Sequence, residues 1–214
     1  IRPRDWSSDV CSSDLPVAAS APLAAVIDAG LRVGSDSGGA FDITVAPLVA
    51  AWGVRQRRTT PPSPTQLAQV RPLVGTANVQ LDQQSHLVRF ARPGVALTLA
   101  GLAKGFAAEV AAGSLSRRGL SGVVDTGESQ FFVGTPLGKP RWSIGLGHPD
   151  RRDGLLGAVD IDRGAVSTIV IDTTTALPGT DERRLDPRTL QPTAKAAAAM
   201  VVAADGTQIG RAHV

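Results

Sequence analysis

The spacing of apolar residues predicts helices near the start of the chain. From Leu23 to Val33 the apolar side chains recur every three or four residues, as in an amphipathic helix, and Gly34 stands where such a helix is expected to stop. A shorter helix is expected through Leu48 to Trp52, with Asp42 or Thr44 as its cap. The first fifty residues therefore favour two helices joined by a glycine-containing loop.

Shorter elements follow. Ser63-Pro64 has the cap-then-proline pattern that opens a helix. Val79–Leu81 and His86–Phe90 alternate apolar and polar residues around a polar turn, which predicts a hairpin, and Val95–Leu99 is a further strand candidate.

A glycine-containing stretch, Gly101 to Gly105, then leads into an alanine-rich helix expected from about Phe106 to Arg118. Short strands separated by Gly/Pro turns come after it. They are expected at Gly122–Val124, Gln130–Val133, Trp142–Leu146, Leu155–Ile161 and Ala165–Thr168. Because helices come early and strands late, without regular βαβ alternation, the pattern predicts an α+β fold.

The two ends of the chain have the pattern of translated adapter DNA. Codons for Asp9 to Leu15 can be chosen whose reverse complement encodes Gln208 to Val214. We therefore interpret residues 1–15 and 208–214 as adapter-derived and non-native, and residues 16–207 as a partial domain. The alternative is two unrelated surface tails.

Composition narrows the classes of function. The 43% of hydrophobic residues suits one domain with a sizeable core, and no apolar run is long enough to cross a membrane. The net charge is only +3 and aromatic residues make up 4%, so the chain offers few stacking platforms and a nucleic-acid-binding function is not favoured. Cys11, the single cysteine, lies within the suspected adapter.

Candidate chemistry centres on Lys104. Two glycines, Gly101 and Gly105, bracket this lysine where a helix begins, so backbone N–H donors and a positive helix end could hold a phosphate with Lys104 as a point charge. The alternative is a tight strand-to-helix turn with an exposed lysine. Taken alone, these residues favour the turn with an exposed lysine over the phosphate site.

Five segments in a fixed order add to this stretch. The chain carries GAFDITVAPLV followed by Trp52-Gly53, then AGLAKG, VVDTGES, AVST, and LDPRTLQP beginning at Leu185. Together these resemble the FAD:protein FMN transferase (ApbE-like) family, which usually shows GAFDPTVGPLV-x-x-WG, GGIAKG, VNxGGD, TSG and HxxDPRTGxP in this order. The resemblance covers nearly all of Phe41 to Pro192.

The resemblance implies an α+β flavin-transferase fold that uses FAD and Mg²⁺. Such a protein moves FMN from FAD to a threonine hydroxyl of an acceptor flavoprotein and releases AMP, and its full-length form would be periplasmic or a membrane-anchored lipoprotein. Asp186 would be catalytic, and the main-chain carbonyl of Gly101 would be a metal ligand. The residues implied to contact the cofactor are Gly101, Ala103, Lys104, Gly105, Asp125, Gly127, Thr168 and Asp186.

Structural roles compete with some of these assignments. Asp186 could be a turn residue before Pro187, and Asp42 could cap the following helix. Phe41 and Trp52 could be core aromatics and not flavin contacts.

The chain also departs from the family pattern. Ala100, Asp125, Glu128, Ser129, Ile169, Val170, Arg183 and Leu190 replace residues that the family usually has. The family's side-chain metal ligands follow a VVA strand, and here Val201–Gly206 leads almost at once into Gln208, so the remaining Mg²⁺ ligands are expected to be missing and the fragment inactive. A flavin-binding homologue without transfer, or a non-flavin α+β binding module, therefore stay as alternatives.

Overall fold

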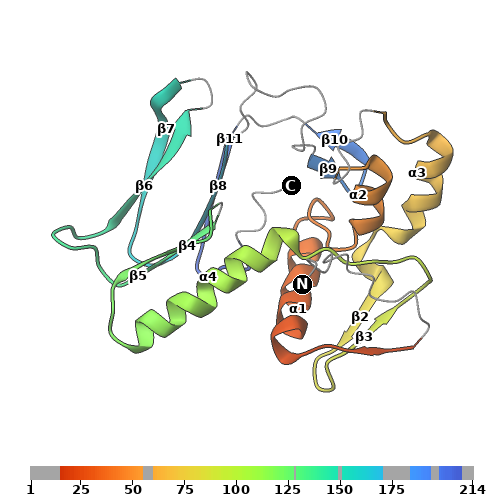
Figure 1. Cartoon of the computed structure of the whole chain (residues 1–214), viewed down its shortest axis with the longest axis horizontal. Coiled ribbons are helices and arrows are strands. Elements are labelled where there is room, and N and C mark those ends of the chain that lie inside the picture. Colours follow the sequence, from red (N-terminus) through yellow and green to blue (C-terminus); the bar gives the residue numbers. More distant parts are fainter. Residues whose placement is uncertain are drawn as a thin grey trace, which may run out of the picture. The chain divides into compact units, whose positions relative to one another are not determined.

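The computed structural model describes residues 15–54, 60–127, 129–148, 151–170, 184–193 and 198–208. Most of the two terminal segments expected to be adapter-derived lies outside these residues. The chain mixes helices and strands, as the α+β prediction requires (Figure 1). It divides into unit 1, residues 1–99 and 185–191, and unit 2, residues 100–184 and 192–214.

The first helix of unit 1 is longer than predicted. Helix α1 (Ala21–Asp36) starts at Ser20, whose side chain accepts the N–H of Leu23, and it continues past Gly34. The expectation that Gly34 stops the helix is therefore wrong. A Cβ at Gly34 would lie 2.7 Å from Cγ2 of Thr76, so this glycine serves close packing.

Two short helices follow in unit 1. Helix α2 (Ala46–Trp52) has Val45 at its N-cap without a side-chain capping bond, so the expectation that Asp42 or Thr44 caps it is wrong. Helix α3 (Pro64–Val70) opens as predicted, because Ser63 and Gln66 form a reciprocal capping box. The 3₁₀ helices η1 (Arg71–Leu73) and η2 (Thr76–Asn78) come next.

The small sheet of unit 1 contains the predicted hairpin. Strands β2 (Val79–Asp82) and β3 (Leu87–Phe90) pair antiparallel, and β1 (Val17–Ala18) pairs with β3 as the third strand. Residues 95–99 form no strand, so that expectation is wrong. Val95 and Leu97 are buried, and the N–H of Thr98 donates to the carbonyl of Ile43, which binds this extended segment to the loop before α2.

The core of unit 1 joins α2 to a distant turn. Leu48 and Trp52 of α2 pack on Leu185 and Leu190, which flank the turn between β9 (Arg184–Asp186) and β10 (Gln191–Thr193). Trp52 is buried in this cluster, and Phe41 is also buried in unit 1, as expected for core aromatics.

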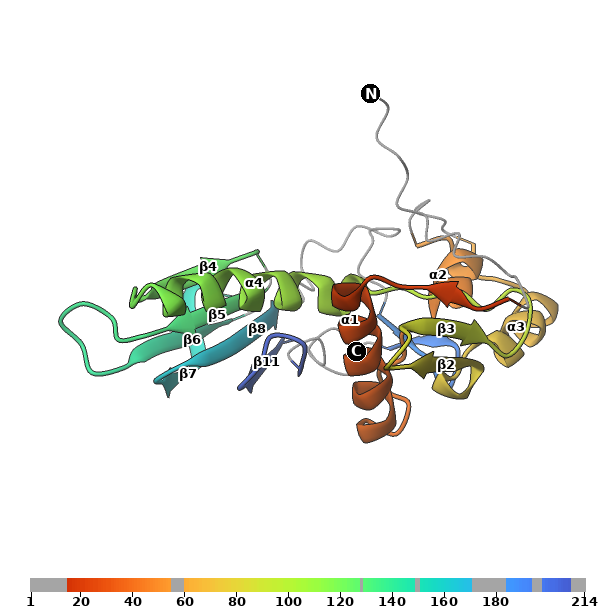
Figure 2. The same cartoon turned by 90° about the horizontal axis from the view of Figure 1, so that it is seen from below.

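Unit 2 is a three-layer arrangement. Its central antiparallel sheet has the order β11 (Ala198–Ala203), β8 (Gly164–Val170), β5 (Ser129–Val133) and β4 (Gly122–Asp125). Helix α4 (Ala100–Arg117) packs on one face through Ala108 and Ala112 (Figure 2). The long hairpin of β6 (Trp142–His148) and β7 (Arg151–Ile161) packs on the other face.

The sequence predicts the strands of unit 2 well, but not the start of its helix. The five expected strands appear at β4 to β8. Helix α4 begins at Ala100 and not near Phe106, so the expected order of strand, glycine loop and helix is wrong. Within the described residues, no helix is long and apolar enough to cross a membrane.

Candidate functional site

The Gly101–Gly105 stretch forms the first turns of α4 and is not a loop. Because an α-helix leaves its first N–H groups without internal partners, the available donors belong to Ala100, Gly101 and Leu102. The N–H groups of Ala103 and Gly105 instead take part in the helix. The side chain of Lys104 is exposed, one turn inside the positive end of the helix dipole. An anion at this helix end would therefore meet backbone donors first and the lysine charge second.

The main-chain carbonyl of Gly101 is the predicted metal ligand. In helix α4 this oxygen accepts the N–H of Gly105, which leaves one lone pair for a further contact. In the part of the chain that the structure describes, no group of three or more His, Cys, Asp or Glu side chains is placed to hold a metal ion. The described side chains therefore do not fit Mg²⁺ by themselves.

Asp125 and Gly127 lie in the turn between β4 and β5. The carboxylate of Asp125 accepts the N–H of Gly127 at 2.7 Å and the side-chain amide of Gln130 at 2.7 Å. These two hydrogen bonds hold the pKa of Asp125 below its usual range. Gly127 has φ of +93°, where glycine is favoured. Asp125 shapes this turn and stays ionised at neutral pH.

Thr168 lies within strand β8 and is partly exposed. The family turn that would follow it is absent here, because Thr168, Ile169 and Val170 all continue the strand. Ser129 pairs with Ser167, so Thr168 lies at the same end of the sheet as the Asp125–Gly127 turn.

Helix α4 contacts the central sheet of unit 2 at the end that lies away from the Asp125–Gly127 turn. Its Leu115 lies next to Gly122 at the start of β4, and its Glu109 bonds to Gly206, just after β11 ends. The candidate residues of unit 2 therefore form two groups, one on α4 and one at the Gly127 turn with Thr168.

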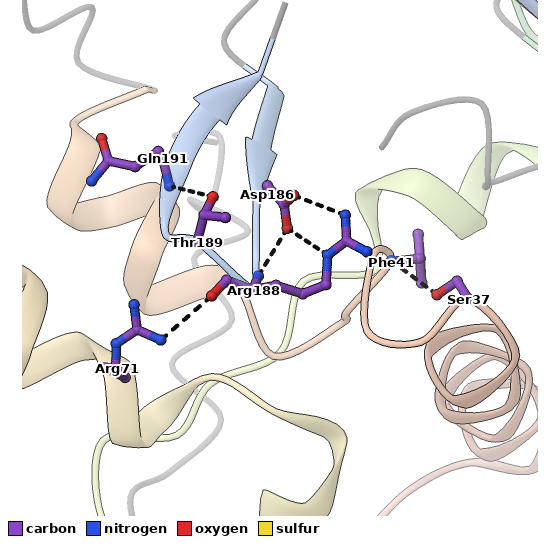
Figure 3. A network of polar contacts seen from close by, with 7 residues as sticks. All are labelled: Ser37, Phe41, Arg71, Asp186, Arg188, Thr189 and Gln191. Atoms are coloured by element: carbon purple, nitrogen blue, oxygen red, sulfur yellow. Dashed lines mark hydrogen bonds and ion pairs between the residues drawn. The ribbon is translucent and has the colours of Figure 1, made fainter. Parts of the chain in front are cut away.

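In unit 1, Asp186 forms a bidentate ion pair with Arg188 (Figure 3). Oδ1 of Asp186 accepts the Nε–H of Arg188 at 3.0 Å and its backbone N–H at 2.9 Å, while Oδ2 accepts Nη2–H at 2.9 Å. The Arg188 side chain thereby lowers the pKa of Asp186 to about 2. A carboxylate with so low a pKa is a weak general base near neutral pH. This geometry supports the turn role of Asp186.

The Asp186–Arg188 pair predicts a specific titration. Because the native state lowers the pKa of Asp186 from 3.8 to about 2, the pair stabilises the fold above about pH 4, and this contribution is lost as the pH falls through about 2. In carboxyl-detected NMR, Asp186 should titrate near pH 2, and Arg188→Gln should return its midpoint toward 3.8. An unchanged midpoint in the variant would contradict the assigned cause.

Leu190 occupies the position where the family has glycine, and it keeps a glycine-like backbone. Its φ is +61°, a left-handed backbone conformation that residues other than glycine rarely adopt. Its N–H donates to the carbonyl of Asp186 at 2.8 Å, and its carbonyl accepts Nε1–H of Trp52 at 3.0 Å. The side chain is buried against Leu48 and Trp52, so packing offsets the backbone cost.

Two further contacts surround the same turn (Figure 3). Nη1 of Arg71 donates to the carbonyl of Arg188 at 3.4 Å, and the Ser37 hydroxyl accepts the N–H of Phe41 at 3.0 Å. The Cγ of Arg188 also approaches Gly39, in the loop after α1. Residues of the first and last family segments therefore meet within unit 1.

Asp42 belongs to a buried polar cluster. Its Oδ1 accepts the backbone N–H of Thr44 at 2.7 Å and the Thr44 hydroxyl at 2.6 Å, and that hydroxyl accepts the N–H of Gly75 at 2.7 Å. Burial raises the pKa of Asp42, against the opposing effect of these hydrogen bonds. Asp42 therefore stabilises the loop before α2 and does not cap the helix.

Sequence reasoning missed Glu109, the bonds of Thr44 to Asp42 and Gly75, and the pairing role of Arg188. The Oε2 of Glu109 accepts the N–H of Gly206 at 2.8 Å, across 97 residues of sequence. One signal was present: Glu109 follows Gly105 by one helical turn and so shares its face of α4. Glu128 and Arg183, two of the departures from the family pattern, lie outside the described residues.

Comparisons with known proteins agree with this architecture. The model of the ApbE family matches residues 7–210. The FAD:protein FMN transferase of Salmonella typhimurium is 28% identical over 159 residues, which cover 72% of this chain and 45% of that protein. The Haemophilus influenzae protein of the same name is 31% identical over 140 residues, 63% of this chain and 40% of its own length. The chain thus spans about half the length of these curated relatives.

Solved structures show the same fold. The ApbE protein of Thermotoga maritima superposes with a TM-score of 0.80 at 26% identity, over 94% of this chain and 66% of that one. The flavin transferase ApbE of Vibrio cholerae superposes with a TM-score of 0.79 at 22% identity, over 94% of this chain and 66% of that one. At this identity the likeness shows the fold alone. The chain is therefore an α+β protein with the architecture of these ApbE structures. It belongs to the ApbE family.

Proposed function

We propose that this chain is part of an FAD:protein FMN transferase, which moves FMN from FAD to a threonine hydroxyl of an acceptor flavoprotein. The match of the ApbE family model to residues 7–210 carries this proposal. The curated relatives named above are FAD:protein FMN transferases, and they align with most of the chain. The start of α4 adds a physical reason, because its backbone donors and Lys104 suit a phosphate ligand.

The proposed reaction is a phosphoryl transfer. The threonine oxygen of the acceptor attacks the phosphorus of the FMN half of FAD, the bond from this phosphorus to the bridging oxygen breaks, and AMP leaves with that oxygen. The hydroxyl proton passes to a base or to solvent. Such a reaction depends on positioning and on neutralising charge at the phosphate oxygens. Lys104 and the N–H groups of Gly101 and Leu102 would supply that neutralisation.

The other predicted contacts receive more limited roles. One end of the unit 2 sheet would contact the cofactor through Asp125, Gly127 and Thr168. The carboxylate of Asp125 already accepts two hydrogen bonds within its own turn. For Asp186 we propose an ionised carboxylate that fixes Arg188 and the following turn. Its low pKa gives little support to proton abstraction.

Mg²⁺ stays a prediction of the family resemblance. When bound, such an ion would neutralise phosphate charge and polarise the reacting phosphate. The described residues offer the Gly101 carbonyl but no cluster of side-chain ligands around it, so the roles proposed above use only the groups of the chain itself.

Acceptor labelling tests this function. The natural full-length protein, incubated with FAD, Mg²⁺ and an acceptor domain carrying the target threonine, should give covalent flavin fluorescence on the acceptor in a denaturing gel. A threonine-to-valine acceptor is the control and should stay dark. Bound FAD without labelling would favour a flavin-binding homologue instead, and absence of FAD binding would favour a non-flavin module.

A further inference from the structure

The chain that leaves β11 turns directly onto α4. Gly206 is buried, and its N–H donates to Oε2 of Glu109 at 2.8 Å. A Cβ added to Gly206 would overlap the carbonyl oxygen of Gly105 and would lie 3.0 Å from Cβ of Glu109. Only glycine therefore allows this backbone to approach α4 so closely.

The two partners on α4 explain the position of the contact. Gly105 and Glu109 are four residues apart, so they lie on one face of the helix in consecutive turns. The backbone carbonyl of Gly105 lies against Gly206, and Glu109 provides the acceptor. The Asp205 carboxylate accepts the Thr207 hydroxyl at 2.7 Å, which closes the turn around Gly206. The segment is thus held by one hydrogen bond and by close packing.

We propose that Glu109 is a positioning residue, whose carboxylate holds the segment after β11 against the first turns of α4. This inference rests on the proposed function, because those turns contain the backbone donors and Lys104 assigned to the FAD phosphates. Glu109 acts through Gly206 and does not contact the ligand. Fixing this segment shapes the backbone around the Gly101–Gly105 stretch before FAD arrives.

Removing the carboxylate of Glu109 would have opposite effects on FAD affinity if Glu109 acts through its hydrogen bond to Gly206 or through its negative charge. Glu109 lies five residues after Lys104, about 7.5 Å further along the helix axis. If its negative charge mattered directly for a phosphate ligand, removing that charge would strengthen binding. If its hydrogen bond to Gly206 matters, glutamine should replace it, because an amide oxygen accepts the same N–H.

Four variants, each made in the natural full-length protein, test the proposal: Glu109→Ala, Glu109→Gln, Gly206→Ala and, as a control, Gly157→Ala. Gly157 is exposed, and a Cβ there would meet nothing within 4 Å. Glu109→Ala should speed hydrogen exchange of the Gly206 amide at least about tenfold and weaken FAD affinity about 3- to 10-fold, as expected for the loss of one hydrogen bond. Gly206→Ala should do the same, while Glu109→Gln and Gly157→Ala should resemble the wild type.

Other results would overturn the proposal. Wild-type exchange and FAD affinity in Glu109→Ala would show that the contact positions nothing. Tighter FAD binding in both Glu109→Gln and Glu109→Ala would assign the effect to charge, and equal loss of affinity in both would show that the hydrogen bond to Gly206 is not its cause. If the natural full-length protein binds no FAD, the proposed function fails and the ligand role of Glu109 fails with it, whereas Gly206 exchange still decides whether Glu109 holds the segment.

Discussion

Replacing Lys104 with alanine is expected to weaken FAD binding about 10- to 100-fold, because a charged hydrogen bond to phosphate contributes about 1.5–3 kcal/mol. Lys104 is exposed on α4, so the same change should affect the free energy of unfolding little. The loss should shrink as salt concentration rises, since salt screens exposed charges. Quenching of FAD fluorescence during titration measures the affinity.

Lys139 provides the matched control for this experiment. It is an exposed lysine of the same unit, in the turn before β6, and no role in binding is assigned to it. Lys139→Ala should bind FAD like the wild type. Equal affinities for Lys104→Ala and the wild type would remove Lys104 from the phosphate site and leave only the backbone donors of α4.

Thr44→Val should destabilise unit 1 by about 2–4 kcal/mol, although the two side chains have nearly the same shape. Thr44 is fully buried, and its hydroxyl joins the carboxylate of Asp42 to the N–H of Gly75. Valine would leave both groups short of a partner, and a buried polar group without its hydrogen bond is costly. Hydrogen exchange of unit 1 amides during urea unfolding would measure the loss.

Two observations check the Thr44 interpretation. Thr44→Ser keeps the hydroxyl and should lose much less stability than Thr44→Val. Removing the Thr44 hydroxyl should also raise the pKa of Asp42 further, because its hydrogen bonds oppose the effect of burial. A native pKa above 3.8 makes the fold lose stability as the pH rises through that pKa, so this loss should be larger in Thr44→Val. Similar stability of the valine and serine variants would contradict the account.

Much of the fold follows from apolar spacing and turn residues. Alternation predicts the β2–β3 hairpin and the strands of unit 2, and the Ser63-Pro64 pattern predicts α3. The failures are also physical. Gly34 resembles a helix stop, but it lies inside α1, where Thr76 packs against it. Gly101 and Gly105 resemble a loop, but helix α4 includes both. Gly34 packs closely against Thr76, and the backbone of Gly105 lies close to Gly206, neither of which local sequence reveals.

The candidate site shows the same limit. Motif order was sufficient to predict the ApbE family. It did not show that Arg188 takes both oxygens of Asp186, or that Glu109 bonds Gly206 from 97 residues away. The positive φ of Leu190 shows that a turn can persist after its family glycine is lost, when core packing supplies the compensation.

The most direct test of the proposed function is the intact mass of the acceptor after incubation of the natural full-length protein with FAD and Mg²⁺, with released AMP measured in the same reaction. We expect the acceptor to gain one FMN moiety on its threonine, with one AMP released for each labelled molecule. An acceptor whose mass stays unchanged, while FAD is bound and no AMP appears, would contradict the assignment as an FMN transferase.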